Sequence, residues 1–181
     1  WIPYFLENSR SAGADLASFG LSLYWVGIIA GRFVASRLVD RVGSLRLLIM
    51  GCLVSAFSSL AAVLVPSVPI AQALLVIAGG ASGATIPLAF SASYAVVPSS
   101  TGSVTASLSI ALLLGRLLAP WTIGALAEAS SMFIAMTVPG LVLIVAALLI
   151  FVVSVLSKRR GVPGVPDGEL PVDNSSESVE N

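Results

Sequence analysis

"GIIAGRFVASRLVDRVGSLRLLIMG", residues 27–51, is an apolar stretch that carries four arginines and one aspartate. From Leu47 to Gly115 the chain then has no charged residue at all. A bilayer-spanning helix needs about 20 mostly apolar residues, so this uncharged run is too long for one span and has room for three. The sequence therefore predicts several membrane spans, with charge concentrated in the connection between two of them.

The composition of the whole chain also indicates a membrane protein. Of the 181 residues, 57% are hydrophobic and 10% are charged, and the mean hydropathy is +1.02. A soluble domain carries about 25% charged residues. Because a water-soluble fold of this length could not bury so much apolar surface, lipid must be the solvent for most of the chain.

Charge and side-chain chemistry exclude several classes of function. The formal net charge is zero, so the basic footprint of a nucleic-acid-binding protein is absent from the sequence. There is no histidine and one cysteine, Cys52, which excludes a disulfide framework and the common metal sites. We therefore expect no cofactor and no metal. We also expect no enzyme, because the spans lack the catalytic pairs or metal ligands that intramembrane hydrolysis requires.

Helices rather than strands are expected to cross the membrane. The strands of a membrane β-barrel alternate apolar and polar residues, whereas the runs here are continuous, and a helix satisfies its own backbone in lipid. Breaks rich in proline or polar residues divide the runs at residues 65–69, 97–103 and 128–131. The fold class is therefore all-α. Spans are expected at residues 16–38, 46–65, 69–97, 103–127 and 132–156. The third is long, and either a kink at Pro87 or an extension past the membrane would explain its length.

The two ends of the chain differ from this bundle of residues 16–157. Residues 1–15 begin with WIPYFL, which is too short to span alone, and we expect the end of a truncated helix followed by an external loop. Since the chain starts with Trp1, we expect it to be incomplete at its N-terminus. Residues 158–181 are expected to form a disordered cytoplasmic tail, because from Gly161 onward they carry five acids, three prolines and no aromatic residue.

Basic residues predict the orientation of the bundle. Arg10 lies alone on one face, whereas seven basic residues lie on the other: Arg32, Arg37, Arg41, Arg46, Lys158, Arg159 and Arg160. Cytoplasmic loops of membrane proteins are enriched in lysine and arginine. We therefore expect a multi-pass protein of the cell membrane whose C-terminus is cytoplasmic.

The order of residues in the charged stretch resembles a known signature. LVDRVG, residues 38–43, is similar to the G-x-L-x-D-R-x-G-R-R signature of the major facilitator superfamily. Ser36 stands in place of the first glycine, and residues 44–45 stand in place of two basic residues. Such weakening suits the second copy of the signature, which members of the family carry between helices 8 and 9.

The rest of the chain agrees with this register. GGASGATIPLAFS, residues 79–91, is similar to helix 10 of the family, and LGRLLAPWTIGALAE, residues 114–128, is similar to helix 11. The resemblance implies the C-terminal half of a secondary transporter, from the end of helix 7 through helix 12, that moves a small-molecule substrate by alternating access. It implies the absent N-terminal half and the lipid bilayer as partners.

The resemblance also implies a gating role for the charged motif. In the family, charge pairs of this loop help to latch the two halves on the cytoplasmic side, and the matching positions are Gly31, Arg37, Asp40, Arg41 and Gly43. Gly43 is expected in the turn, where glycine adopts left-handed angles at little cost. Asp40 is expected near the start of the following helix, where the helix dipole favours a carboxylate. The alternative is a plain solvated turn.

Arg116 requires an explanation of its own. It lies thirteen positions after Ser103, about 20 Å along the expected helix and near the middle of a bilayer core of about 30 Å. A basic residue there costs roughly 2.5–3.5 kcal/mol on insertion scales, so we expect it to face the bundle interior or water. It either binds an anionic or polar substrate or pairs with a carboxylate of the absent half, and snorkelling to a surface is a third possibility.

Several other residues complete the set of candidates. By resemblance, helix 10 lines the central cavity, so Thr85, Ser91 and Tyr94 are candidate substrate contacts. Arg32 is expected to have a structural role and to snorkel to the cytoplasmic surface.

Small residues are expected to bring helices together. Gly27 with Gly31, and Gly79 with Gly83, have the spacing that lets membrane helices approach closely. The alternative function that this suggests is a membrane structural or assembly protein that uses its helices for packing alone. Arg116 discriminates between the two, because a scaffold gains nothing from a cation at mid-membrane.

Overall fold

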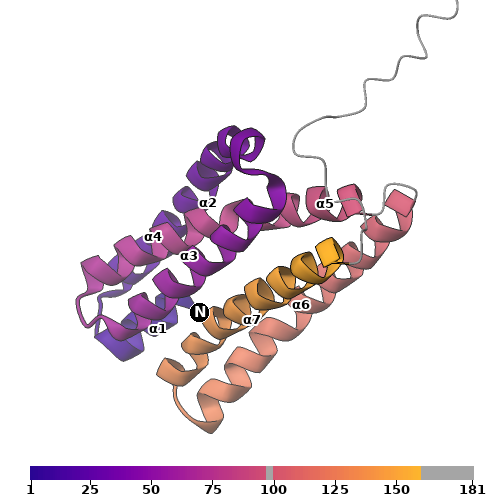
Figure 1. Ribbon diagram of the computed structural model, residues 1–181. Helices are drawn as coiled ribbons and strands as arrows, with labels where there is room; N and C mark the ends of the chain where they lie inside the picture. Colours follow the sequence, from indigo (N-terminus) through magenta and orange to yellow (C-terminus); the bar gives the residue numbers. More distant parts are fainter. Residues whose placement is uncertain (97–99, 160–181) are drawn as a thin grey trace, which may run out of the picture.

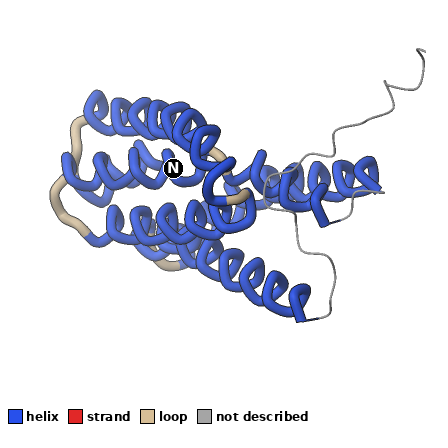
Figure 2. Tube along the Cα trace, turned by 45° about the horizontal axis from the view of Figure 1, so that its top comes forward, coloured by secondary structure: helices blue, strands red, loops and turns tan. Residues whose placement is uncertain are grey.

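The computed structural model describes residues 1–96 and 100–159, and nearly all of them are helical (Figure 1). The helices are α1 (Ile2–Arg10), α2 (Ala14–Val42), α3 (Ser44–Leu64), α4 (Val68–Gly83), α5 (Thr85–Val96), α6 (Thr101–Ala129) and α7 (Met132–Arg159). Within the described ranges there is no strand (Figure 2), so the expected all-α fold is confirmed. Residues 97–99 and the predicted tail from residue 160 onward lie outside the described residues.

Five helical segments of the described chain are long and apolar enough to cross a membrane. They are Ala14–Val42, Ser44–Leu64, Val68–Ala95, Thr101–Ala129 and Met132–Leu156. The third contains both α4 and α5. The largest difference from the expected spans is at α2, which continues to Val42 instead of ending at residue 38.

The break between α4 and α5 follows from a proline. In a continuous helix the N–H of residue 87 would donate to the carbonyl of Gly83, but Pro87 has no N–H. The first helix ends at Gly83, Ala84 is a turn residue, and the second helix begins at Thr85. The interruption therefore lies about one turn before the proline rather than at it.

A single residue, Gly43, turns the chain from α2 into α3. Its φ of 86° and ψ of 146° lie in a region that is accessible essentially to glycine alone. The N–H of Gly43 donates to the carbonyl of Val39 at 2.9 Å, and the carbonyl of Gly43 accepts from the N–H of Leu47 at 3.1 Å. One residue thus ends one span and starts the next.

The charged motif belongs to a helix rather than to a loop. Arg37, Asp40 and Arg41 have exposed side chains in the last two turns of α2. The expectation that Asp40 lies near the start of the following helix is wrong, because α3 begins only at Ser44. The physical reason is that no glycine or proline interrupts α2 between Arg32 and its end.

Glycines let α2 and α4 pack backbone against backbone. A Cβ atom added at Gly27, Gly31, Gly79 or Gly83 would collide with a backbone carbonyl of the opposite helix. The two expected small-residue pairs therefore face each other across one interface. Close approach of this kind places the polar backbone of each helix within reach of the other helix's side chains.

The third helix lies at the centre of the packed part of the bundle. Leu48, Cys52 and Ala56 of α3 are buried, and the helix packs against α4, α5 and α7. α7 comes close because Gly140 leaves room for the side chain of Leu60. The buried core is therefore built on α3.

α6 differs from the other spans. Throughout its length, Thr101–Ala129, no side chain is buried, and it lies at the edge of the bundle beside α7 (Figure 1). Leu117 and Trp121 are 70% and 71% exposed. An apolar surface of this extent requires lipid or further protein around it.

Candidate functional site

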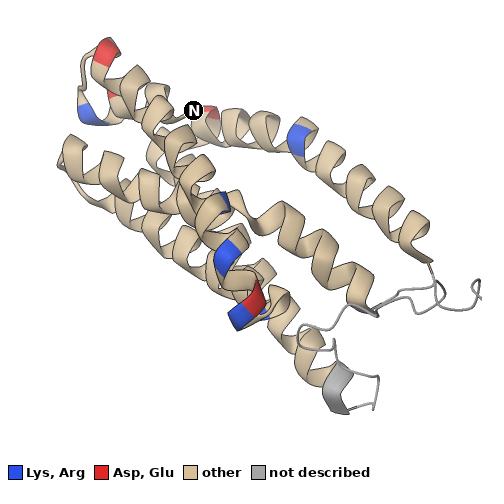
Figure 3. Ribbon diagram, turned by 90° about the horizontal axis from the view of Figure 1, so that it is seen from above, with Lys and Arg blue, Asp and Glu red and all other residues tan. Residues whose placement is uncertain are grey.

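Two arginines lie inside helices long enough to span a membrane: Arg32, five residues before Arg37, and Arg116, twelve residues from the nearest other charge on its helix. Figure 3 shows acidic and basic residues mostly gathered in two places, with long uncharged helical stretches between them. Arg32 lies within α2, and Arg116 lies one residue from the middle of α6. Since each helix is about 43 Å long at 1.5 Å per residue, both arginines fall within the depth of a hydrocarbon core of about 30 Å.

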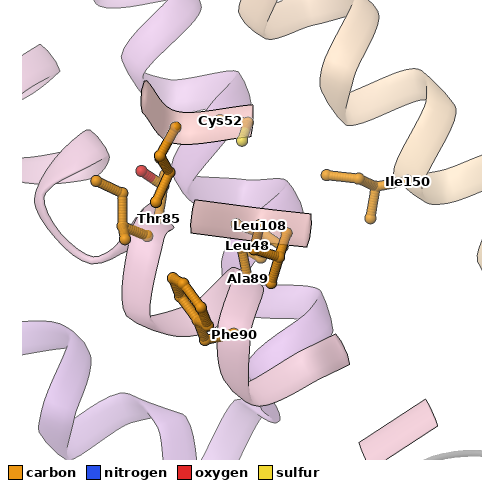
Figure 4. Close-up of a pocket in the computed structure, with 9 residues that line it drawn as sticks. Leu48, Cys52, Thr85, Ala89, Phe90, Leu108 and Ile150 are labelled. Carbon is orange, nitrogen blue, oxygen red and sulfur yellow. The ribbon is translucent and has the colours of Figure 1, made fainter. Parts of the chain in front are cut away.

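A pocket of about 240 Å³ lies between α3, α5, α6 and α7 (Figure 4). Nine residues line it: Leu48, Cys52, Thr85, Ile86, Ala89, Phe90, Leu108, Leu112 and Ile150. Among these nine, the Thr85 hydroxyl and the Cys52 thiol are the polar side-chain groups. A mainly apolar pocket with a few polar groups is the usual form of a site for a small molecule.

The three expected contacts on the helix-10 segment are not brought together. Thr85 lines the pocket, and its hydroxyl donates to the carbonyl of Ser82 at 2.7 Å. Tyr94 lies at the junction with α6, where its hydroxyl oxygen is 2.8 Å from that of Thr105. Ser91 is exposed and does not line this pocket. Of the three candidate contacts, Thr85 is therefore the one that lines the pocket.

Arg116 lies on the stripe of α6 that faces α5. Thr105 of this stripe bonds to α5, and Leu108 and Leu112 line the pocket. Residues four apart share a helix face, so Arg116 continues the stripe about 6 Å beyond Leu112. Its side chain is exposed, and Arg116 is not among the residues that line the pocket.

The backbone at Arg116 is polar as well. In a helix, the N–H of residue 120 would donate to the carbonyl of residue 116, and Pro120 has no N–H. An unpaired carbonyl is costly in lipid. This point of α6 therefore offers both donors and an acceptor in the middle of a span.

Arg32 has a backbone partner in the neighbouring helix. Its Nε donates to the carbonyl of Gly83 at 3.0 Å, which is the carbonyl that Pro87 leaves without a helical donor. This contact is consistent with the expected structural role. α2 continues to Val42, so Arg32 lies about three turns from the end of its helix, and snorkelling to the cytoplasmic surface stays a prediction.

Arg10 makes a similar contact at the opposite end of the bundle, which sequence analysis did not detect. Its Nη2 donates to the carbonyl of Val63, in the last turn of α3, and its guanidinium carbon lies 5.7 Å from the centre of the Phe5 ring. The last carbonyls of a helix lack intrahelical partners and favour a cation. Nothing in the local sequence distinguishes this arginine from a solvated one.

The motif residues divide between packing and surface. Gly31 lies in the interface with α4, whereas Arg37 borders an open hollow on α2 with Phe33 and Leu38. Across residues 1–96 and 100–159, no three His, Cys, Asp or Glu side chains lie close enough to hold a metal ion.

Comparisons with known proteins add an independent line of evidence. The sequence profile of the Major Facilitator Superfamily matches residues 1–175. An uncharacterized transporter of Sinorhizobium fredii is 29% identical over 149 residues, which are 82% of this chain and 40% of that protein. An uncharacterized MFS-type transporter of Yersinia pestis is 25% identical over 147 residues, 81% of this chain and 38% of that protein. The chain thus spans about 40% of the length of these relatives, and no solved structure matches it at a significant level.

Proposed function

The chain belongs to the major facilitator superfamily, and we propose that it forms part of a secondary transporter that moves a small anionic or polar solute by alternating access. The observation that carries this proposal is the position of Arg116, in the middle of α6 and in line with Leu108 and Leu112 of the pocket. A cation at this depth costs roughly 2.5–3.5 kcal/mol on insertion scales. A scaffold that used its helices for packing alone would gain nothing to offset that cost.

In this proposal, Arg116 binds the anionic or polar group of the solute, and the pocket binds the rest of the molecule. The guanidinium presents a planar fork of N–H donors that fits a carboxylate or phosphate group. The Thr85 hydroxyl and the Arg116 carbonyl supply further polar contacts, and Phe90 and Leu112 accommodate the apolar part of the molecule. In transporters of this architecture, two halves rock around a site near the midplane.

The proposal includes further helices that cover the exposed stripe of α6 and complete the cavity. It also includes a cytoplasmic position for the C-terminus and for the motif at the end of α2, supported by the excess of basic residues on that face. Asp40 and its arginine neighbours act there as a latch that stabilises the outward-facing state.

The proposed substrate-binding role of Arg116 can be tested by measuring ligand binding to the purified complete transporter. We expect some small carboxylates or organic phosphates to raise its melting temperature more than their neutral amide or alcohol analogues, because a ligand stabilises the state that it binds. Arg116→Gln should weaken such binding at least about tenfold, since truncating one partner of a buried charge pair costs about 2 kcal/mol or more. Arg116→Lys should retain part of it, because the charge remains but the fork is lost.

Arg46→Gln is the matched control, because Arg46 is an exposed cation in the first turn of α3; it should leave binding unchanged. Equal stabilisation of wild type and Arg116→Gln by every anion would exclude a substrate role. If Arg116 instead pairs with a carboxylate elsewhere in the transporter, Arg116→Gln should abolish folding, and neutralising that carboxylate as well should restore it.

A further inference from the structure

The interruption of the third span has a side-chain partner from another helix. Pro87 removes the N–H that would satisfy the Gly83 carbonyl, and the Nε of Arg32, 51 residues away in sequence, donates to that carbonyl at 3.0 Å. An unpaired carbonyl in a membrane span is strongly unfavourable, because lipid offers it no donor. The arginine therefore replaces a bond that the proline makes impossible.

The contact also suits the charge of Arg32. Gly83 is the last residue of α4, and the C-terminal end of a helix carries partial negative charge that favours a cation. Arg32 lies five residues before Arg37 in α2, and its Nε has the Gly83 carbonyl as a partner in the neighbouring helix. The interaction therefore stabilises both the guanidinium and the C-terminal end of α4.

The surrounding packing holds the contact in place. Gly27 and Gly31 bring α2 against the backbone of α4, so the Arg32 side chain starts close to its partner. On the other side, the Ser55 hydroxyl of α3 donates to the carbonyl of Ala78 at 3.0 Å. The last turns of α4 are therefore bonded from two neighbouring helices, directly before the chain enters α5.

We propose that Arg32 is a positioning residue that fixes the break in the third span. By holding Gly83, it sets the direction in which α5 leaves α4, and so the position of Thr85 in the wall of the pocket. The role of Arg32 at the break stands on the hydrogen bond itself, whereas its importance for solute recognition rests on the proposed function.

A double-mutant cycle between Arg32 and Pro87 tests this inference in the purified complete transporter. Arg32→Gln should lower the melting temperature by about 2–4 °C, since hydrogen bonds to charged groups contribute strongly and the shift per bond is small in a chain as long as the relatives. It should also change the rate at which an impermeant thiol reagent labels Thr85→Cys in a Cys52→Ser background. Pro87→Ala restores the missing N–H. In the Pro87→Ala background, the changes in melting temperature and in labelling rate caused by Arg32→Gln should therefore be at most half as large.

Pro139→Ala is the matched control, because Pro139 lies inside α7; the effects of Arg32→Gln should persist in full there. Equal effects of Arg32→Gln with and without Pro87→Ala would overturn the proposal. If Arg32→Gln alone does not fold, recovery of folded protein on adding Pro87→Ala supports it, and failure to recover overturns it. Because neither readout depends on a solute, the result is independent of the Arg116 binding test.

Discussion

Arg10, Arg32 and Arg116 show two ways in which this chain places a cation beside apolar surroundings. Arg10 and Arg32 each donate to a carbonyl in the last turn of a helix, where partial negative charge offsets the loss of water. Arg116 lies in the middle of α6 instead, far from any helix end. Its environment must therefore supply the compensation from water, a solute or another chain segment.

At Gly31 the absence of a side chain is essential for packing. A Cβ atom there would overlap the carbonyl of Gly80 in α4. We predict that Gly31→Ala lowers the free energy of unfolding by about 1–3 kcal/mol, the usual cost of overpacking, measured by denaturant or thermal unfolding of the purified protein. Gly102→Ala is the control, because nothing lies within 4 Å of its added Cβ. Equal stability of the two variants would show that α2 and α4 do not pack as described.

At the scale of helices, the spans could be predicted from the sequence, but the side-chain contacts between them could not. Continuous apolar runs predicted five spans, because every span must be long and apolar for the same physical reason. Pro87 favoured a kink as one explanation for the length of the third. The partner of that kink, Arg32, lies 51 residues away, and only the packing of α2 on α4 reveals it. The apolar run predicted that α2 ends near residue 38, one to two turns after Arg32, whereas the helix continues to Val42.

The turn between α2 and α3 shows the same limit. The sequence predicted a glycine turn at Gly43, and the structure has one there with a φ of 86°. The candidate site was predictable only in part: Thr85 lines the pocket, but Ser91 does not, because in so uniform a helix no periodicity distinguishes the inward face.

The motif at the end of α2 yields a prediction about gating. In the complete transporter, Asp40→Asn should shift the cavity toward the cytoplasm-facing state, because the proposed latch would lose the charge by which it stabilises the outward-facing state. Labelling of Thr85→Cys from the outside, in a Cys52→Ser background, should then become slower. Gly43 should be left unchanged in this variant, so that the turn is preserved. Unaltered labelling would show that the motif is only a solvated helix end with no role in gating.

At the scale of the whole molecule, charge distribution predicts orientation. In intact cells carrying Cys52→Ser, an impermeant thiol reagent added outside should label Asn8→Cys, because Arg10 is the lone basic residue of that face. Ser44→Cys, at the start of α3, should react only after the cells are permeabilised. The reverse labelling pattern would show that the bundle has the opposite orientation in the membrane.

The exposed surface of α6 connects the molecule's architecture to its proposed activity. The other four spans pack on one another around α3, whereas α6 buries no side chain along its length. Its stripe with Leu108, Leu112 and Arg116 borders the pocket. We infer that this stripe lines a water-filled cavity of the complete transporter.

Accessibility of position 116 from water tests that inference most directly. In a Cys52→Ser background, Arg116→Cys should react with a charged, membrane-impermeant thiol reagent, whereas Leu114→Cys, about 200° around the same helix, should not. A cysteine at position 116 that reacts with a lipid-soluble maleimide but never with the charged reagent would place this residue in lipid and contradict the account.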